Sequence, residues 1–268
     1  MPELPDVEND RRLLDRLARR KIIRAVEVGD DRVLRKLSPA EFKRRAVGRR
    51  IVSSRRHGKH LLVALDKGGW ITLHFGMTGA LVPHPSQGEA PAFTRLRLEL
   101  SGGGSLCYTD PRRLGHVGLA EDADQFIAVE KLGPDALDPK LTLVRFRALV
   151  EAARGNAKSV LMDQSRIAGI GNSYGDEILF QARLHPELPI RHLDAGDVTQ
   201  LYRATRRVLK EAITRGAGSE NFVDHLPASY LLRHRHPGGR CPRCGGPIAL
   251  LRIGGRAAYY CPHCQPLA

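Results

Sequence analysis

The first residues of the chain, Met1-Pro2-Glu3, place a secondary amine beside a carboxylate once the initiator Met1 has been removed. An α-amino group titrates near pH ~8, so a substantial fraction of it is nucleophilic at neutral pH. When a secondary amine attacks a sugar aldehyde carbon it forms a cationic iminium, which is an electron sink. A structural interpretation is also open, since Pro and acidic residues are common in the first turn of a helix, here near residue 5.

Four of the five cysteines form a second group of chemically active residues near the C-terminus. Cys241 and Cys244 make one C-x-x-C motif, Cys261 and Cys264 make another, and 16 residues separate the pairs. This spacing is typical of a four-thiolate structural zinc site. Disulfides are the alternative, but we expect an intracellular protein, where disulfides are rare. Because four thiolates close the coordination shell, the sequence predicts one structural Zn²⁺ with no catalytic role.

The residues between the two cysteine pairs predict a zinc ribbon. "PIALLRI" and "RAAYY" are short strand patterns, and Gly254-Gly255 is a two-residue hairpin turn between them. Arg256 follows the turn directly, where a guanidinium could grip a phosphate or simply be solvated. Cys107, between Leu106 and Tyr108, is predicted to be a buried strand thiol.

Composition indicates the kind of partner. The 268 residues have a net charge of +14, and the basic residues recur along the whole chain instead of forming a tail. A folded basic surface of this kind favours nucleic acid as the partner, because neutralising phosphates supplies affinity for any sequence. With 42% hydrophobic residues the chain can form real cores, while no apolar run approaches the ~20 residues of a membrane span and no signal-peptide pattern opens it. We therefore expect a soluble protein that does not bind membranes.

The elements that must position these groups predict a multidomain α+β fold. Strand-length apolar or alternating segments fill residues 20–120 and favour a β-sandwich behind a leading helix, which we place at residues 1–129. A segment rich in Pro, Gly and Asp at residues 130–140 predicts a linker. Helical patterns then dominate residues 141–232, and the cysteine hairpin occupies residues 233–268.

A glycine-containing turn, "AGIGNSYGDEILF", interrupts the helical region. Gly169 and Gly171 permit a tight turn, and Asn172 could cap the helix that follows. Backbone amides at such a turn can form a phosphate site, although a plain turn between two helices explains the pattern equally well.

Taken together and in this order, these segments resemble the formamidopyrimidine-DNA glycosylase and endonuclease VIII (Fpg/Nei) family, closer to the Fpg branch. The likeness runs from Pro2 to Cys264, and the matching segments are "PELPDVE", "GKHLLV", "HFGMTGAL", "YTDPRRLG", "LMDQSRIAGIGNSYGDEILF" and the cysteine ribbon. The resemblance implies the order β-sandwich, helix–two-turns–helix domain and zinc finger. It also favours Pro2 as a nucleophile over Pro2 as a mere helix start.

The resemblance further implies catalytic roles for four residues. Pro2 would attack the anomeric carbon of an everted nucleotide, and Glu3 would act as the acid/base group. Lys59 matches the family's strand lysine near the elimination step, and Arg256 matches the ribbon arginine that grips phosphate.

Further residues match positions at which the family contacts DNA. Met77 and Arg112 occupy wedge positions, which fill the gap left by an extruded base. Leu114 stands where many members have Phe, so the wedge keeps an apolar body but loses stacking. The resemblance implies phosphate contacts for Lys158 and Asn172, and it places Tyr174 and Glu177 at the lesion site.

The function implied is base-excision repair by a bifunctional DNA glycosylase and AP lyase. It would remove oxidised purines such as formamidopyrimidines and 8-oxoguanine, then cleave the strand by β,δ-elimination. The segment 215–230 is shorter than the loop that closes over 8-oxoguanine in many members, so an oxidised-pyrimidine preference stays open. So do a lyase acting only at abasic sites and a non-catalytic, damaged-DNA-binding zinc protein. We expect a monomer acting on double-stranded DNA with oxidised bases or abasic sites, in the cytoplasm and nucleoid of a bacterium.

Overall fold

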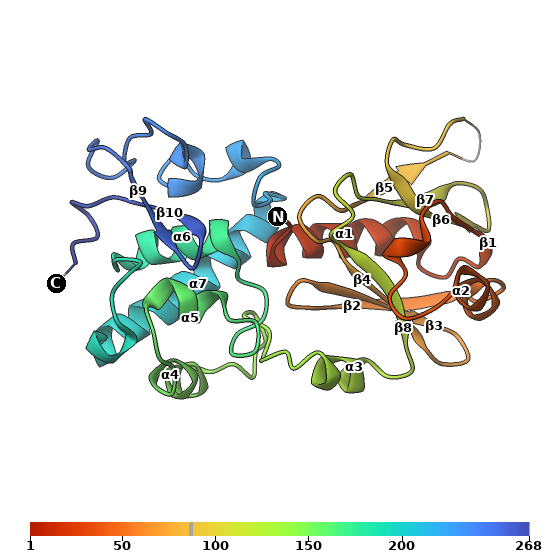
Figure 1. Cartoon of the computed structure of the whole chain (residues 1–268), viewed down its shortest axis with the longest axis horizontal. Helices are drawn as coiled ribbons and strands as arrows, with labels where there is room; N and C mark the ends of the chain where they lie inside the picture. The colour runs from red at the N-terminus through yellow and green to blue at the C-terminus, as the bar shows by residue number, and fades with distance from the viewer. Residues whose placement is uncertain (86–87, 268) are drawn as a thin grey trace. The chain divides into compact units, whose positions relative to one another are not determined.

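The computed structural model describes residues 1–85 and 88–267 and divides into two compact units. The N-terminal unit comprises Met1–Pro2 and Asp6–Lys131, and the C-terminal unit comprises Glu3–Pro5 and Leu132–Ala268. Residues 3–5 therefore pack with the C-terminal unit although they stand at the start of the chain. Figure 1 shows the elements of each unit.

The chain begins with helix α1 (Leu4–Ala18), close to the predicted start near residue 5. Val7, Leu14 and Ala18 recur at helical spacing and are buried in the core of the N-terminal unit. Charged side chains of both signs occupy much of the rest of the helix. Among them, Arg11 is held on the helix surface by Glu8 and Asp15 at 2.8 and 2.7 Å.

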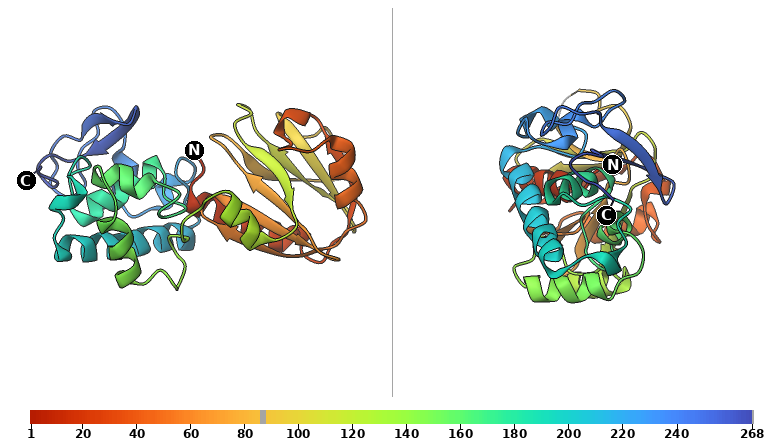
Figure 2. Two further views of the ribbon diagram at one scale, coloured as in Figure 1. Left: turned by 60° about the horizontal axis from the view of Figure 1, so that its bottom comes forward. Right: turned by 90° about the vertical axis from the view of Figure 1, so that its left-hand side faces the viewer.

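The predicted β-sandwich of the N-terminal unit is confirmed. Two antiparallel four-stranded sheets, with strand orders β1-β6-β7-β5 and β2-β3-β4-β8, share one hydrophobic core among the described residues (Figure 2). Their strands are β1 (Ile23–Val28), β2 (Ile51–His57), β3 (His60–Leu65), β4 (Trp70–His74), β5 (Ala80–His84), β6 (Thr94–Leu100), β7 (Ser105–Thr109) and β8 (His116–Ala120). The short helices η1 (Asp31–Val33), α2 (Pro39–Ala46) and α3 (Ala123–Val129) complete the unit.

Alternating residues explain why β6 forms as it does. Leu96, Leu98 and Leu100 are buried while their neighbours are less so, which is the period-two pattern of a strand with one face in a core. By contrast, all five residues of β7 are buried, and Cys107 is a buried free thiol there, as predicted.

The C-terminal unit is helical, as predicted. Its elements are α4 (Leu143–Glu151), α5 (Ala157–Met162), α6 (Asn172–Ala182), η2 (Ile190–His192), α7 (Ala195–Arg215), η3 (Val223–His225) and η4 (Leu231–His234). The longest, α7, starts at a capping box formed by Asp194 and Asp197 and ends at Gly216, whose φ of 66° is left-handed. The buried faces of α4, α6 and α7 form one hydrophobic core.

The C-terminal hairpin consists of β9 (Ala249–Ile253) and β10 (Arg256–Tyr260), paired antiparallel across the Gly254-Gly255 turn. Both glycines have positive φ, as a two-residue turn of this kind requires. Phe180 of α6 and Leu231 of η4 pack with Cys241 and Cys261 in one cluster. The hairpin therefore belongs to the same compact unit as the helices.

The residues predicted as a linker, 130–140, are mostly part of the C-terminal unit, which starts at Leu132. Ala136 is buried in the helical core, and its N–H donates to Ala168 O at 2.9 Å. Of the helices that the structure describes, none has the length and hydropathy needed to cross a membrane.

Candidate active site and DNA interface

Glu3 is almost completely buried in the C-terminal unit, at 1% exposure. Its carboxylate accepts backbone hydrogen bonds from Gly171 at 2.6 Å, Ser173 at 2.8 Å and Tyr174 at 3.2 Å. These N–H groups lie at the start of α6, where no local side chain caps the helix. Glu3 therefore supplies an acceptor for N–H groups at the start of α6 that have no partner within the helix.

The Gly169-Ile170-Gly171 turn is shaped to receive the N-terminal segment. Gly169 has φ 118°, and a Cβ there would overlap the Leu4 side chain. Leu4 N donates to Gly169 O at 3.0 Å. The turn was predicted as a phosphate site or a plain turn. The structure instead gives the amides of Gly171, Ser173 and Tyr174 to the chain's own Glu3 carboxylate, because burial within the same unit brings residues 3–4 onto the turn.

Lys59 lies in the tight turn between β2 and β3, beside Gly58, whose φ is 55°. The side chain is largely buried, at 8% exposure. Its charge is felt by His74 on the neighbouring strand. Burial lowers the pKa of His74 to about 4, and repulsion from His116, Lys59 and Arg35 adds to this effect.

A row of histidines beside Lys59 was missed by sequence reasoning. Strand register places His60 opposite His74, and His74 opposite His116. The ring centroids of these two pairs are 4.8 and 5.1 Å apart. The positions are far apart in the sequence, and only the pairing of β3, β4 and β8 aligns them. Only the register of these three strands, had it been predicted correctly, would have revealed the histidine row.

The candidate wedge residues occupy two loops of the N-terminal unit. Met77 lies between β4 and β5 and is 39% exposed, and Leu114 lies between β7 and β8 and is 49% exposed. Arg112 is exposed in the same loop as Leu114. A large apolar side chain at this exposure on a basic surface suits insertion between bases.

Lys158 does not suit the phosphate contact predicted for it. The side chain is 0% exposed, and Nζ donates to Asp176 Oδ1 at 2.6 Å and to Ala257 O at 2.9 Å. Asp176 also accepts from Arg235 at 2.8 Å and from Tyr259 N at 3.1 Å. The sequence could not show that these partners would enclose the ammonium group. We interpret Lys158 as a buried link between α5, α6 and the hairpin.

Tyr174 and Glu177, predicted to line the lesion site, are both 0% exposed. Desolvation raises the pKa of Glu177 to about 7, although Gln181 and the Leu232 N–H donate to its carboxylate at 2.7 and 2.8 Å. Tyr174 contributes its backbone N–H to Glu3. In this structure the side chains of these two residues support α6 from within.

Asn172 and Arg256 differ in their exposure. Asn172 is the first residue of α6 and is half-buried, and its Oδ1 is a buried atom with no hydrogen-bond partner among the described residues. Arg256 is exposed at the first position of β10, directly after the hairpin turn. Arg256 is therefore available to an external ligand.

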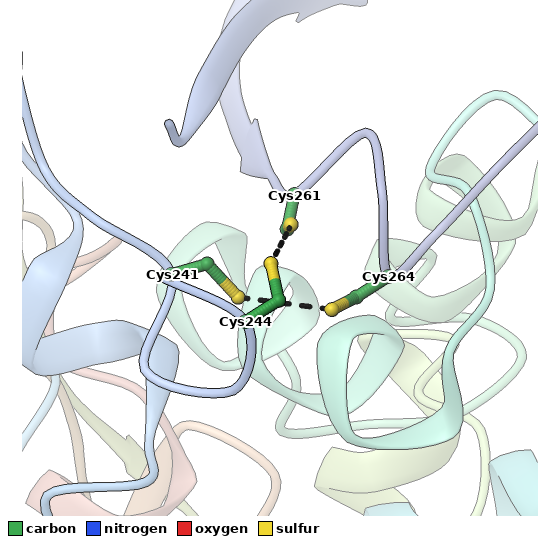
Figure 3. Close-up of side chains that lie close together, drawn as sticks. All are labelled: Cys241, Cys244, Cys261 and Cys264. Atoms are coloured by element: carbon green, nitrogen blue, oxygen red, sulfur yellow. Dashed lines mark hydrogen bonds between the residues drawn. The ribbon is translucent and has the colours of Figure 1, made fainter. Parts of the chain in front are cut away.

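The four cysteine sulfurs converge on one point, as Figure 3 shows. The sulfurs of Cys241 and Cys264 are 3.8 Å apart, and those of Cys244 and Cys261 are 3.5 Å apart. A tetrahedral zinc site with Zn–S bonds of about 2.3 Å requires sulfur separations of about 3.8 Å. The donor set and its geometry thus fit one structural zinc ion, and the predicted zinc site is confirmed.

Comparisons with known proteins agree with this arrangement. Residues 1–117 match the formamidopyrimidine-DNA glycosylase N-terminal domain, residues 132–224 match its H2TH domain, and residues 238–267 match the zinc finger found in FPG and IleRS. These matches define a zinc-finger protein with the domain order of a DNA glycosylase.

The relatives extend the match to the whole chain. Formamidopyrimidine-DNA glycosylase from Pelotomaculum thermopropionicum is 35% identical, with 99% of each chain covered. The enzyme of that name from Thermus thermophilus is 38% identical, covering 99% of this chain and 98% of its own. The Lactococcus lactis Fpg structure with abasic-site DNA has a TM-score of 0.89 at 26% identity, covering 98% of this chain and 99% of that one. The chain belongs to the formamidopyrimidine-DNA glycosylase family.

Proposed function

We propose that the chain is a base-excision-repair DNA glycosylase and AP lyase that removes oxidised purines such as formamidopyrimidines and 8-oxoguanine. The observation that supports this most directly is the anchored Glu3, which is joined by one peptide bond to Pro2. A protein that only bound damaged DNA would not need a buried carboxylate beside a secondary amine. Structures of similar proteins hold DNA containing carbocyclic 8-oxo-G, with MutM, and DNA containing Fapy-dG, with a mutant of Lactococcus lactis FPG.

In the first step, after Met1 has been removed, the lone pair of the Pro2 nitrogen attacks C1′ of the extruded nucleotide. The N-glycosidic bond breaks, and its electron pair leaves with the base, which takes up a proton. Glu3 takes up the proton that the attacking Pro2 nitrogen loses and transfers it to the sugar ring oxygen as the ring opens, which leaves a C1′=N⁺ iminium on Pro2. The backbone hydrogen bonds to Glu3 hold this acid/base group in place while the proton moves.

In the second step, the iminium acidifies the C2′ proton. Loss of this proton expels the 3′ phosphate by β-elimination, and a second elimination expels the 5′ phosphate. Hydrolysis of the remaining iminium then frees Pro2. We assign Lys59 to this stage as a cation close to the departing phosphate, and Arg256 to binding a phosphate beside the lesion.

DNA binding draws on both units. The net charge of +14 supplies affinity for the phosphate backbone. Met77, Arg112 and Leu114 would fill the space of the extruded base, and Asn172 would contact the backbone. One chain contains all of these groups, so we propose a monomer acting on damaged double-stranded DNA in the bacterial nucleoid.

Strand cleavage on three labelled duplexes tests the proposal. One contains 8-oxoguanine opposite cytosine, one an oxidised pyrimidine, and one an unmodified base at the same position. We expect cleavage of the first, with a phosphate on both new ends, and none of the third. Preference for the second would move the substrate class to pyrimidines. Absence of cleavage in the first two, by protein verified to begin at Pro2, would contradict the enzymatic function.

A further inference from the structure

Two loops of the N-terminal unit carry the residues assigned to gap filling. The first, residues 75–79, connects β4 to β5 and presents Met77. The second, residues 110–115, connects β7 to β8 and presents Arg112 and Leu114. We call them wedge loops 1 and 2. In the proposed function both loops act at the same extruded nucleotide. Contacts that fix the two loops relative to each other would therefore affect base extrusion.

Asp110 joins the two loops through both carboxylate oxygens. Its Oδ1 accepts from Thr78 Oγ1 of wedge loop 1 at 2.7 Å, and its Oδ2 accepts from Gly115 N of wedge loop 2 at 2.8 Å. The Thr78 hydroxyl also accepts from Arg112 N at 3.2 Å. Asp110 is 0% exposed, so water cannot replace these bonds.

The backbones of the two loops are also in direct contact. Gly76 has φ 57°, and a Cβ there would overlap the backbone of Leu114 and Gly115. A Cβ at Gly115 would overlap the Tyr108 hydroxyl, which donates to His74 O at 2.9 Å. Glycine is therefore required at both points of closest approach, and neither loop can shift without the other.

The conformation of wedge loop 2 also depends on being held. Arg113, between Arg112 and Leu114, has a left-handed φ of 57°, which non-glycine residues rarely adopt. Its guanidinium pairs with Asp30 at 3.0 Å, and Arg95 Nε donates to Asp110 O at 2.9 Å. The exposed side chains of this loop thus extend from a backbone fixed on its buried side.

We propose that Asp110 is a positioning residue that couples wedge loops 1 and 2, so that Met77 and Leu114 enter the duplex as one unit during base extrusion. This proposal rests on the proposed function, in which these residues fill the gap. The Asp110 carboxylate itself touches neither the sugar nor the lesion. Its loss should therefore impair extrusion and leave the chemistry at Pro2 unchanged.

The test compares a lesion in a fully paired duplex with the same lesion in a bubble whose flanking bases are unpaired. In the bubble, the cost of unpairing and unstacking is already met, so wedge insertion contributes little. Asp110→Asn keeps the shape but cannot accept both hydrogen bonds. Thr78→Val removes the hydroxyl link by an isosteric change, and Thr78→Ser, which keeps the hydroxyl, is the matched control.

We expect Asp110→Asn and Thr78→Val to slow excision in the paired duplex by about 10- to 100-fold, the equivalent of losing one or two buried hydrogen bonds. Both should cleave the bubble within about twofold of the wild type. Thr78→Ser should resemble the wild type on both DNAs. A 2-aminopurine base next to the lesion should report slower extrusion in the two impaired variants.

An equal loss on both DNAs, or no loss on either, would overturn the coupling role. Asp110→Asn could impair folding in general. Thr78→Val is the second variant because it breaks the link between the loops while the Asp110 carboxylate stays bonded to Gly115. Failure of the proposed function is seen separately, because the wild-type protein would then cleave neither DNA.

Discussion

The carboxylate of Glu3 accepts a 2.6 Å hydrogen bond from the backbone N–H of Gly171, 168 residues away in the chain. This bond and those from Ser173 and Tyr174 make residue 3 the cap of α6. Because Pro2 is bonded directly to Glu3, the start of α6 also fixes where the proposed nucleophile is tethered. Folding of the C-terminal unit therefore holds the residue next to the proposed catalytic amine.

Replacing Glu3 with Gln should separate its chemical role from its capping role. The amide cannot donate or accept the proton that ring opening needs, so base excision should fall by about 10²–10⁴-fold. One N–H of the turn loses its acceptor, which should lower the free energy of unfolding by about 1–3 kcal/mol. Excision kinetics and urea unfolding measure the two effects, with the exposed Glu151→Gln as the control. Excision near the wild-type rate would exclude Glu3 as the acid/base group.

Lys158→Met should lower the free energy of unfolding and leave the affinity for DNA phosphates unchanged. It removes one member of a fully buried ion pair with Asp176, for which a cost of about 3 kcal/mol is expected. Arg235 remains on the other oxygen of Asp176 and limits the loss. Thermal unfolding and the salt dependence of DNA binding measure the two effects, with the exposed Lys140→Met as the matched control. A flatter salt dependence with unchanged stability would restore Lys158 as a phosphate ligand.

Arg256→Ala should weaken DNA binding in a way that depends on salt. Removing one phosphate contact should reduce the slope of log K against log salt by about 0.9. Arg256→Lys keeps the charge but cannot form the bidentate hydrogen bonds of a guanidinium with a phosphate. It should therefore have the wild-type salt slope but only part of the wild-type affinity for DNA. Lys43→Ala, on α2, removes an equal charge where no contact is proposed. An equal change of slope in Lys43→Ala would show that Arg256 acts only through net charge.

Cys244→Ala should abolish the zinc site, since three thiolates cannot complete the tetrahedral shell. We expect one zinc per wild-type chain and a large loss in the variant, measured by metal analysis after dialysis. The matched control is Cys107→Ser, which alters a buried thiol of β7 outside the cluster. Zinc retained at one per chain in Cys244→Ala would contradict the four-cysteine assignment.

The histidine row should make the N-terminal unit sensitive to acid. Burial is the main cause that lowers the pKa of both His60 and His74, and the neighbouring histidines add to it. The unfolded chain therefore binds more protons than the folded one below pH ~6.5, and stability should decrease on acidification from there toward pH ~4. Each histidine contributes up to about 1.4 kcal/mol per pH unit in this window.

His60→Phe tests this dependence, because the ring already packs edge-on against Phe126 at 5.5 Å between centroids. Urea unfolding at pH 7 and pH 5 should show a smaller difference in the variant than in the wild type. The exposed His192→Gln should leave the difference unchanged. A variant with the full wild-type difference would show that the acid sensitivity arises elsewhere.

Local patterns in the sequence were sufficient for part of this architecture. The alternation of β6, the C-x-x-C pairs and the Gly254-Gly255 turn each specify their own conformation, so the sandwich and the zinc hairpin were predictable. The strand signal is weaker at β5, which contains Pro83, and at β8, which follows the glycine-containing wedge loop 2.

The surroundings of Glu3, Lys158 and the histidine row depended on contacts between residues that are distant in the sequence. The resemblance implied an acid/base role for Glu3, but nothing local to residue 3 showed that its carboxylate would cap α6. The resemblance implied a phosphate contact for Lys158, yet Asp176 and the hairpin enclose its ammonium group. The histidine row exists only through the register of three strands. No local pattern encodes such pairings, and the resemblance to known glycosylases located several of these residues without revealing their surroundings.

Borohydride trapping tests the central claim, that Pro2 forms a covalent iminium with damaged DNA, most directly. Protein verified to begin at Pro2 is incubated with a duplex containing 8-oxoguanine or an abasic site, reduced, and the linked peptide is mapped by mass spectrometry. The account predicts a crosslink at Pro2 with both duplexes. A crosslink at a lysine, or none with either duplex, would contradict it.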